Sequence, residues 1–165
     1  MKIKTIIKIV VFRPLPELIK LNYILICFFE IRFSYFGDFV SRYLRCRLLR
    51  KYGVEICKGA VLSKSVIFKH PTGIVIGGGA VIEDDVIIHQ GVTFGAKNFD
   101  DAGKGEEAKQ LIKRGAIIGA GAKVIGNVEI GENSIVSANS VVTRSVPANC
   151  IVYGVNKVKK KHSGT

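Results

Sequence analysis

The sequence predicts a mainly β fold: a β-solenoid preceded by a short helical region. The strongest observation is a period of six from residue 76 onward, interrupted once, in which large apolar residues recur at every sixth position. These residues are Ile76, Ile82, Ile88, Phe94, Ile112, Ile118, Val124, Ile130, Val136 and Val142. A globular helix requires a period of about 3.6 and an ordinary strand a period of about two. A sustained period of six therefore indicates short strands joined by tight turns in a coil.

Small residues form a second column, four positions after each large one. The column consists of Ala80, Val86, Val92, Asn98, Ala116, Ala122, Val128, Ser134, Ser140 and Val146. Only Asn98 departs from Ala, Ser or Val, and it stands where the pattern begins to fail. Glycines follow directly after four of the large residues, at Gly77, Gly95, Gly119 and Gly131. We expect them at corners, because glycine adopts backbone angles that other residues resist.

Two irregularities interrupt the coil. Counting in sixes from Ile56 gives Leu62, Phe68 and Ile74, so the phase slips by two residues before Ile76. We place this slip near Gly73 to Val75, as a bulge beside His70. Residues 97–110 break the pattern with polar residues and with Gly103 and Gly105, which predicts a surface loop. A bulge and a loop are the places where a solenoid wall can form a cleft.

The pattern divides the chain into three parts: a helical region at 1–52, a β-solenoid at 53–156 and a basic tail at 157–165. In the first part, apolar and aromatic residues recur at helical spacing, at Ile24, Phe28, Ile31, Tyr35, Phe39 and Tyr43, and basic residues crowd its end. Two interpretations stay open for it. The helices cap the open end of the solenoid, or they form a basic amphipathic surface for peripheral contact with anionic lipids.

The charge distribution argues against a nucleic-acid partner. The chain has a formal net charge of +12, but residues 53–156 contain ten basic and ten acidic residues. The excess lies in residues 1–52, with eleven basic residues against three acidic ones, and in the last nine residues, with four lysines. A nucleic-acid binder is expected to carry a basic stripe on a folded face with recognisable motifs, and this chain shows neither.

The cysteines and apolar segments predict a cytoplasmic protein. Cys27, Cys46, Cys57 and Cys150 are widely spaced and form no CxxC pair, which favours buried free thiols in a reducing compartment. Lys8 interrupts the first apolar run, and no small-residue cleavage site follows it. The run from Leu18 to Phe29 is shorter than the roughly 20 residues that span a bilayer.

Two stretches within residues 54–154 resemble a known family. They read HPTGIVIGGGAVIEDDVIIHQGVTFG at 70–95 and IIGAGAKVIGNVEIGENSIV at 117–136. They resemble the hexapeptide-repeat acyltransferases, and within these the serine acetyltransferase branch, including the two-residue slip after the histidine. The resemblance implies a left-handed parallel β-helix, a homotrimer and acetyl-CoA as co-substrate without a metal.

The resemblance also implies a catalytic pair, His70 and Glu55. An acidic residue stands fifteen positions before the family's histidine, and here this residue is Glu55 where serine acetyltransferases have Asp. An alcohol is a poor nucleophile at neutral pH, and an imidazole removes its proton as it attacks a thioester. The carboxylate would orient the imidazole and stabilise its cation. His89 is the rival base.

Further site residues follow from the same resemblance. Gly95, Ala96, Ala120 and Ala138 match the family's coenzyme contacts and would bind mainly through the main chain. The coenzyme would lie in the groove between neighbouring β-helices of the trimer. Lys69 and Lys109 replace the Asp and the second His that bind serine in the family, and with Lys97 they form a set of cations that suits an anionic acceptor.

These departures from the serine acetyltransferase pattern favour a different acceptor. The chain also lacks the long helical N-terminal domain of the serine enzymes and resembles small O-acetyltransferases of surface polysaccharides. We therefore expect acetyl transfer to a sugar hydroxyl in polysaccharide or glycolipid biosynthesis. The alternatives are a serine O-acetyltransferase of cysteine biosynthesis and an inactive trimeric scaffold. A zinc carbonic anhydrase is excluded, because only His70 and His89 lie in the coil and three imidazoles are needed.

Overall fold

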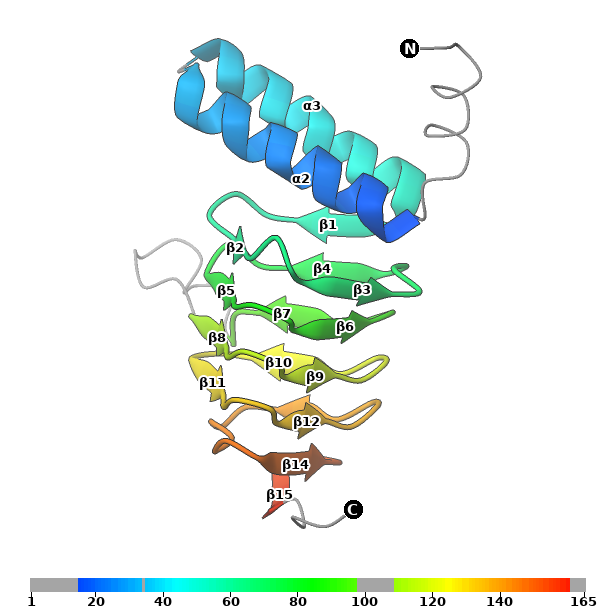
Figure 1. The fold of residues 1–165 in the computed structure, drawn as a ribbon, viewed down its shortest axis with the longest axis vertical. Coiled ribbons are helices and arrows are strands. Elements are labelled where there is room, and N and C mark those ends of the chain that lie inside the picture. The colour runs from blue at the N-terminus through cyan, green and yellow to red at the C-terminus, as the bar shows by residue number, and fades with distance from the viewer. Residues whose placement is uncertain (1–14, 34, 98–108, 161–165) are drawn as a thin grey trace. The chain divides into compact units, whose positions relative to one another are not determined.

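The computed structural model describes residues 15–33, 35–97 and 109–160 (Figure 1). The chain divides into two compact units, Met1–Tyr52 and Gly53–Thr165. The first unit is helical and the second is a β-solenoid.

The helical unit consists of α2 (Leu15–Arg32) and α3 (Tyr35–Tyr52), which pack against each other. An ion pair joins them, because the Arg45 guanidinium donates to Glu30 Oε1 at 2.9 Å. The buried apolar side chains include Ile19, Ile26, Leu44 and Leu48. Phe28, Ile31, Phe39 and Tyr43, which the spacing had placed on one helical face, are exposed. The predicted helical region is thus confirmed for the described residues.

Neither α2 nor α3 combines the length and the apolar character that crossing a bilayer requires.

The second unit winds through three sheets whose strands pair parallel except for the last one, and each of the first four turns adds one strand to every sheet (Figure 1). Sheet A contains β1 (Val54–Ile56), β4 (Ile74–Ile76), β7 (Thr93–Gly95), β10 (Lys123–Ile125) and β13 (Val141–Val142). Sheet B contains β2 (Val61–Leu62), β5 (Ala80–Ile82), β8 (Gln110–Ile112) and β11 (Val128–Ile130). Sheet C contains β3 (Ile67–Lys69), β6 (Ile87–His89), β9 (Ile117–Ile118), β12 (Ile135–Val136), β14 (Cys150–Tyr153) and β15 (Lys157–Lys160). This architecture confirms the predicted parallel β-solenoid.

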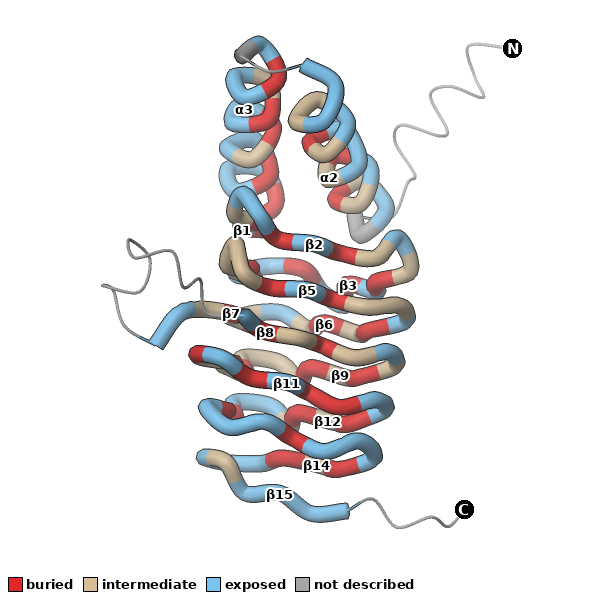
Figure 2. Tube along the Cα trace, turned by 90° about the vertical axis from the view of Figure 1, so that its left-hand side faces the viewer, coloured by how far each residue is buried: buried red, intermediate tan, exposed pale blue. Residues whose placement is uncertain are grey.

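The two sequence columns form the core of the solenoid. All ten large residues of the first column are at most 1% exposed, and the nine described residues of the second are at most 2% exposed. Asn98 lies outside the described residues. Figure 2 shows the consequence, a regular alternation of buried and exposed positions along every coil. Parallel pairing in register stacks equivalent residues of successive coils, so the large residues form one ladder of contacts in each of the three sheets.

The corner glycines serve a different purpose from the predicted one. Gly77, Gly95, Gly119 and Gly131 are not among the glycines with positive φ. Three of the four instead lie where the next coil's backbone approaches closely: a Cβ built on Gly119 would lie 2.6 Å from the Ala138 nitrogen. Left-handed backbone occurs at other glycines, such as Gly73, Gly91 and Gly121.

The two-residue slip also lies earlier than predicted. Lys69 pairs with His89, twenty residues later, whereas Val75 pairs with Thr93, eighteen residues later. Thr72 already follows the second spacing. Its carbonyl accepts at 2.8 Å from the N–H of Gly91, the residue directly after Gln90, and Gln90 lies eighteen positions after Thr72. The two extra residues are therefore His70 and Pro71, rather than residues near Gly73 to Val75. The corner absorbs them, so the strands before and after it keep their pairing with the next coil.

The ends of the predicted loop and tail differ from expectation. Gln110 is the first residue of β8, so the loop ends before it, and residues 98–108 lie outside the described part. Residues 157–160 form β15, which pairs antiparallel with β14. All four cysteines are free thiols, but only Cys150 is buried.

Candidate active site

The predicted site residues fall at two kinds of corner in the solenoid. The chain turns from sheet C to sheet A at residues 70–73, 90–92, 119–122 and 137–140, which we call the C–A corner. It turns from sheet A to sheet B at residues 57–60, 77–79 and 126–127 and between β7 and β8, which we call the A–B corner. Each sheet A strand is at most three residues long and separates the two corners of its coil.

His70 occupies the extra step of the first C–A corner. It follows β3 directly, is exposed and has a positive φ of 50°. The same left-handed backbone recurs at other corners of the solenoid, for example at Asp85, Asn133 and Asn139. The insertion therefore displays an imidazole at the surface of the solenoid.

Lys69 and His89 accompany His70. Lys69 is the last residue of β3, and it pairs directly with His89, the last residue of β6. Lys69 is exposed and His89 is half-buried. The structure thus gathers one cationic and two imidazole side chains where sheet C meets the C–A corner.

Glu55 lies on the neighbouring sheet A strand without contacting His70. The corner that contains His70 stacks on the start of β1, because the Gly73 N–H donates to the Gly53 carbonyl at 2.8 Å. Glu55 is exposed two residues further along β1, and its Oε1 accepts from the Cys57 thiol at 3.9 Å. Within the described residues no hydrogen bond joins Glu55 to His70. A reacting pair requires the two side chains to turn toward each other.

The predicted coenzyme residues divide between the two corners. Ala120 and Ala138 stack at the C–A corner, where the Asn139 N–H donates to the Ala120 carbonyl at 2.8 Å. Gly95 ends β7 and Ala96 begins the A–B corner. In the Ala120 coil, the chain reaches its A–B corner only at Gly126, six residues later. At about 3.3 Å per extended residue, a distance of up to roughly 20 Å separates the two corners of one coil.

The predicted substrate lysines divide in the same way. Lys97 lies at the A–B corner, with its Cβ 3.6 Å from the position that a Cβ on Gly126 would take. The Lys109 N–H donates to Asn127 Oδ1 at 2.7 Å, so Lys109 lies at the same corner. Lys69 lies at the end of β3 beside His70. Two of the three cations therefore accompany Gly95 and Ala96, and the third accompanies His70.

Sequence reasoning missed two polar residues near these corners. Lys123 Nζ donates to the Gly91 carbonyl at 2.7 Å and to Thr93 Oγ1 at 2.9 Å. The buried Gln110 side chain donates to the carbonyls of Gly95 and Gly126. A signal for Gln110 existed: it stands two positions before Ile112, where the other coils place a small residue.

Two carboxylates and their partners link successive coils between sheets B and C. Asp84 accepts hydrogen bonds from the hydroxyls of Ser63 and Ser65. Both bonds lower the pKa of the Asp84 carboxyl, and the bond from Ser63 is the larger cause. The hydrogen bond from Lys113 to Glu83, at 2.9 Å, raises the pKa of Lys113. These residues link successive coils at the turn from sheet B to sheet C. They therefore join coils and lie apart from the predicted site residues.

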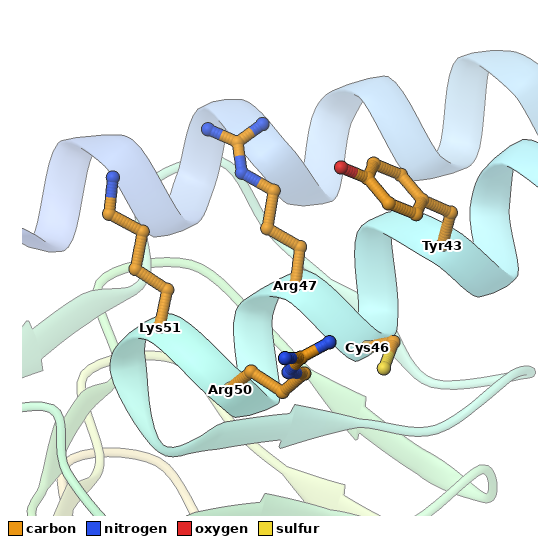
Figure 3. A pocket seen from close by; sticks show the side chains of 5 residues that line it. All are labelled: Tyr43, Cys46, Arg47, Arg50 and Lys51. Carbon is orange, nitrogen blue, oxygen red and sulfur yellow. The ribbon is translucent and has the colours of Figure 1, made fainter.

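Two further observations on the described residues concern ligand binding. They include no group of three His, Cys, Asp or Glu side chains that could hold a metal ion. A pocket of about 330 Å³ lies on α3, lined by Tyr43, Cys46, Arg47, Arg50 and Lys51 (Figure 3). All of its lining residues belong to the helical unit, and none is a predicted site residue.

Comparison with known proteins identifies the solenoid. The bacterial transferase hexapeptide family (six repeats) matches residues 111–144. The serine acetyltransferase of Buchnera aphidicola from Acyrthosiphon pisum is 40% identical over 118 residues, which cover 70% of this chain and 41% of the relative. The chain thus spans about two fifths of the length of this curated relative.

Solved structures lead to the same family. A truncated serine acetyltransferase apoenzyme has a TM-score of 0.71 and 32% identity, over 84% of this chain and 55% of that one. A serine acetyltransferase in complex with CoA has a TM-score of 0.66 and 35% identity, over 74% of this chain and 49% of that one.

These relatives correct the predicted acceptor. The expectation of a sugar hydroxyl in polysaccharide or glycolipid biosynthesis was wrong, because the relatives are serine acetyltransferases, which was the alternative. The argument from Lys69 and Lys109 failed because it considered only how a lysine repels the ammonium group of serine. Serine also carries a carboxylate, which a lysine attracts. Residues 111–144 therefore match the bacterial transferase hexapeptide family, and the chain is a relative of the serine acetyltransferases.

Proposed function

We propose that this chain is a serine O-acetyltransferase that uses acetyl-CoA. The observation that carries the proposal is the 40% identity to a serine acetyltransferase across 70% of the chain, together with a His70 that the solenoid displays on an inserted corner. The solved relative with CoA supports acetyl-CoA as the donor. The proposal includes a cytoplasmic location, and membrane contact by residues 1–52 forms no part of it.

His70 acts as the general base in direct transfer. Its imidazole takes the proton from the serine hydroxyl as the hydroxyl oxygen attacks the thioester carbonyl. The carbon–sulfur bond then breaks, the acetyl group stays on the serine oxygen, and the departing CoA sulfur receives the proton from the imidazolium. Glu55 turns toward His70 and stabilises the imidazolium. No acyl-enzyme forms in this scheme.

The proposal gives the lysines two different tasks. Lys69 lies beside His70 and contacts the serine carboxylate, since an ammonium and a carboxylate form a charge-assisted hydrogen bond. Lys97 and Lys109 share a corner with Gly95 and Ala96 and face the phosphates of the coenzyme. This assignment fits the division of the three cations between the corners.

A homotrimer completes the proposed site. The coenzyme contacts at Ala120 and Ala138 lie across sheet A from those at Gly95 and Ala96. A groove between two neighbouring solenoids brings the C–A corner of one copy against the A–B corner of the next. The proposal therefore places each coenzyme between two protomers.

The test is CoA release from acetyl-CoA with L-serine, followed with a thiol reagent after subtraction of the protein's own cysteines. We expect serine-dependent release, reduced at least about 10²-fold in His70→Asn. His89→Asn is the matched control, because it removes the neighbouring imidazole. It should retain activity within a few-fold. Release that serine does not stimulate would contradict the proposed acceptor, and a larger loss in His89→Asn would move the base to His89.

A further inference from the structure

Gln110 is a buried amide at the A–B corner. It is 1% exposed and begins β8, where it pairs with Ala80 of β5 and with Val128 of β11. The neighbouring coils thus fill this interior position with small apolar side chains. Gln110 Nε2 donates to the Gly95 carbonyl at 3.1 Å and to the Gly126 carbonyl at 2.8 Å. One side chain therefore connects the A–B corners of two successive coils.

This amide donates to a carbonyl whose equivalents in other coils accept from a backbone N–H. In the two preceding coils the Ala60 N–H donates to the Cys57 carbonyl, and the Ala80 N–H donates to the Gly77 carbonyl. Gly95 is the next residue in this series, because Ile76 pairs with Phe94 and each is followed by one of these glycines. Among the described residues, the Gln110 side chain is the donor that reaches Gly95 from the same coil.

The arrangement fixes the direction of the next peptide group. The Gly95 carbonyl also accepts from the Gly126 N–H at 2.8 Å, so two donors hold it toward the following coil. In a trans peptide the N–H points opposite to the carbonyl, so the Ala96 N–H points away from that coil. Ala96 is exposed, and its N–H donates to none of the residues that the structure describes.

We infer that Gln110 is a positioning residue that presents the Ala96 N–H to an acceptor oxygen of the coenzyme. The inference rests on the proposed function, because Ala96 is a coenzyme contact only in an acetyl-CoA enzyme. Gln110 itself is buried and does not touch the coenzyme. It acts through the Gly95–Ala96 peptide, whose orientation it sets before the coenzyme arrives, so that less ordering is needed on binding.

The experiment measures CoA affinity by titration calorimetry in the full chain, without any acceptor. Gln110→Met keeps the size and removes both donors. We expect its Kd for CoA to rise about tenfold, the effect of one lost or misdirected hydrogen bond. Its KM for acetyl-CoA should rise in parallel, while its KM for serine stays within about twofold. Gln110→Asn keeps the donor on a shorter side chain and serves if the Met variant fails to fold.

Ser134→Ala is the matched control. The Ser134 hydroxyl is buried, donates to the Pro147 carbonyl at 2.7 Å and accepts from the Cys150 N–H at 3.2 Å, at another corner. It also bridges two coils, so its loss lowers the melting temperature without changing CoA affinity. An unchanged CoA Kd in the Gln110 variants, or an equal rise in Ser134→Ala, would overturn the inference. If the wild type binds CoA without acetylating serine, only the proposed acceptor fails; if it binds no CoA, both proposals fall.

Discussion

Lys69 and His89 lie directly opposite each other in the parallel pairing of β3 with β6, at the edge of the corner that displays His70. The pairing joins residues twenty positions apart, and the two inserted residues follow Lys69 immediately. The ammonium group and two imidazoles thus share one small region of the surface. A positive group beside the proposed base would suit the carboxylate of the proposed serine acceptor.

Replacing Lys69 by Ala should weaken serine binding. Loss of a charge-assisted hydrogen bond to the carboxylate corresponds to a rise of about tenfold or more in the KM for serine, with a smaller effect on kcat. Steady-state kinetics at saturating acetyl-CoA measure both constants. Lys64→Ala is the control, because Lys64 is an exposed lysine of the same coil at a different corner. A lower KM in Lys69→Ala would show that Lys69 repels the serine ammonium instead.

Glu55→Gln should lower kcat by about tenfold or more, because a neutral amide stabilises the imidazolium of His70 poorly. Glu55→Asp should keep most of the activity, since it retains the carboxylate. The chain contains a matched control: β11 repeats the tripeptide Val-Glu-Ile of β1 and places Glu129 at the equivalent exposed position. Kinetics of Glu129→Gln should match the wild type. An unaffected kcat in Glu55→Gln would mean that His70 works without a carboxylate partner.

The sequence predicted the solenoid core well because one physical rule generates it. Each of the three sides of a coil must place a large and a small residue inside, so the period of six appears directly in residues such as Ile88 and Ala122. The site was harder to predict, because its residues occupy corners, where no interior position constrains residue type. The slip at His70 and Pro71 was placed too late. Counting by sixes uses core residues alone, so it locates a change of phase only to the interval between two of them.

Gln110 shows a second limit of the pattern. Its position is interior and calls for a small apolar residue, so a polar side chain there looked like part of the loop. Its partners are the backbone carbonyls of Gly95 and Gly126, and backbone partners leave no mark in the sequence. Glu55 and His70 illustrate the opposite case, in which a spacing of fifteen is visible but the orientation of the two side chains is not.

Asp84→Asn should destabilise the solenoid at neutral pH but not at low pH. The hydroxyls of Ser63 and Ser65 lower the pKa of Asp84 below its usual value of 3.8. A carboxyl whose pKa is lower in the folded state stabilises that state fully above its unfolded pKa, and the contribution disappears as the pH falls through the folded pKa. The wild type should therefore melt at a higher temperature than the variant near pH 7, with the difference shrinking below about pH 4.

Circular dichroism melts of both proteins at several pH values test this dependence. Asp85→Asn is the control, because it removes the adjacent carboxylate without changing the bonds to the two serine hydroxyls. A difference in melting temperature that stays constant down to about pH 3 would show that Asp84 stabilises the coil by packing rather than by its charge.

Gly119→Ala should destabilise the solenoid more than Gly95→Ala does. A Cβ on Gly119 would lie 2.6 Å from the Ala138 nitrogen and 2.7 Å from the Val136 carbonyl oxygen, both backbone atoms of the next coil. The coils must separate to admit it, at a cost of about 1–3 kcal/mol. A Cβ on Gly95 would meet only the side chains of Ile125 and Thr93, at 3.6 and 3.8 Å, which is ordinary contact. Melting temperatures at one fixed protein concentration compare the two variants, because association adds to apparent stability. Equal stability of both would mean that the coils are spaced more loosely at the C–A corner than the Gly119 contacts require.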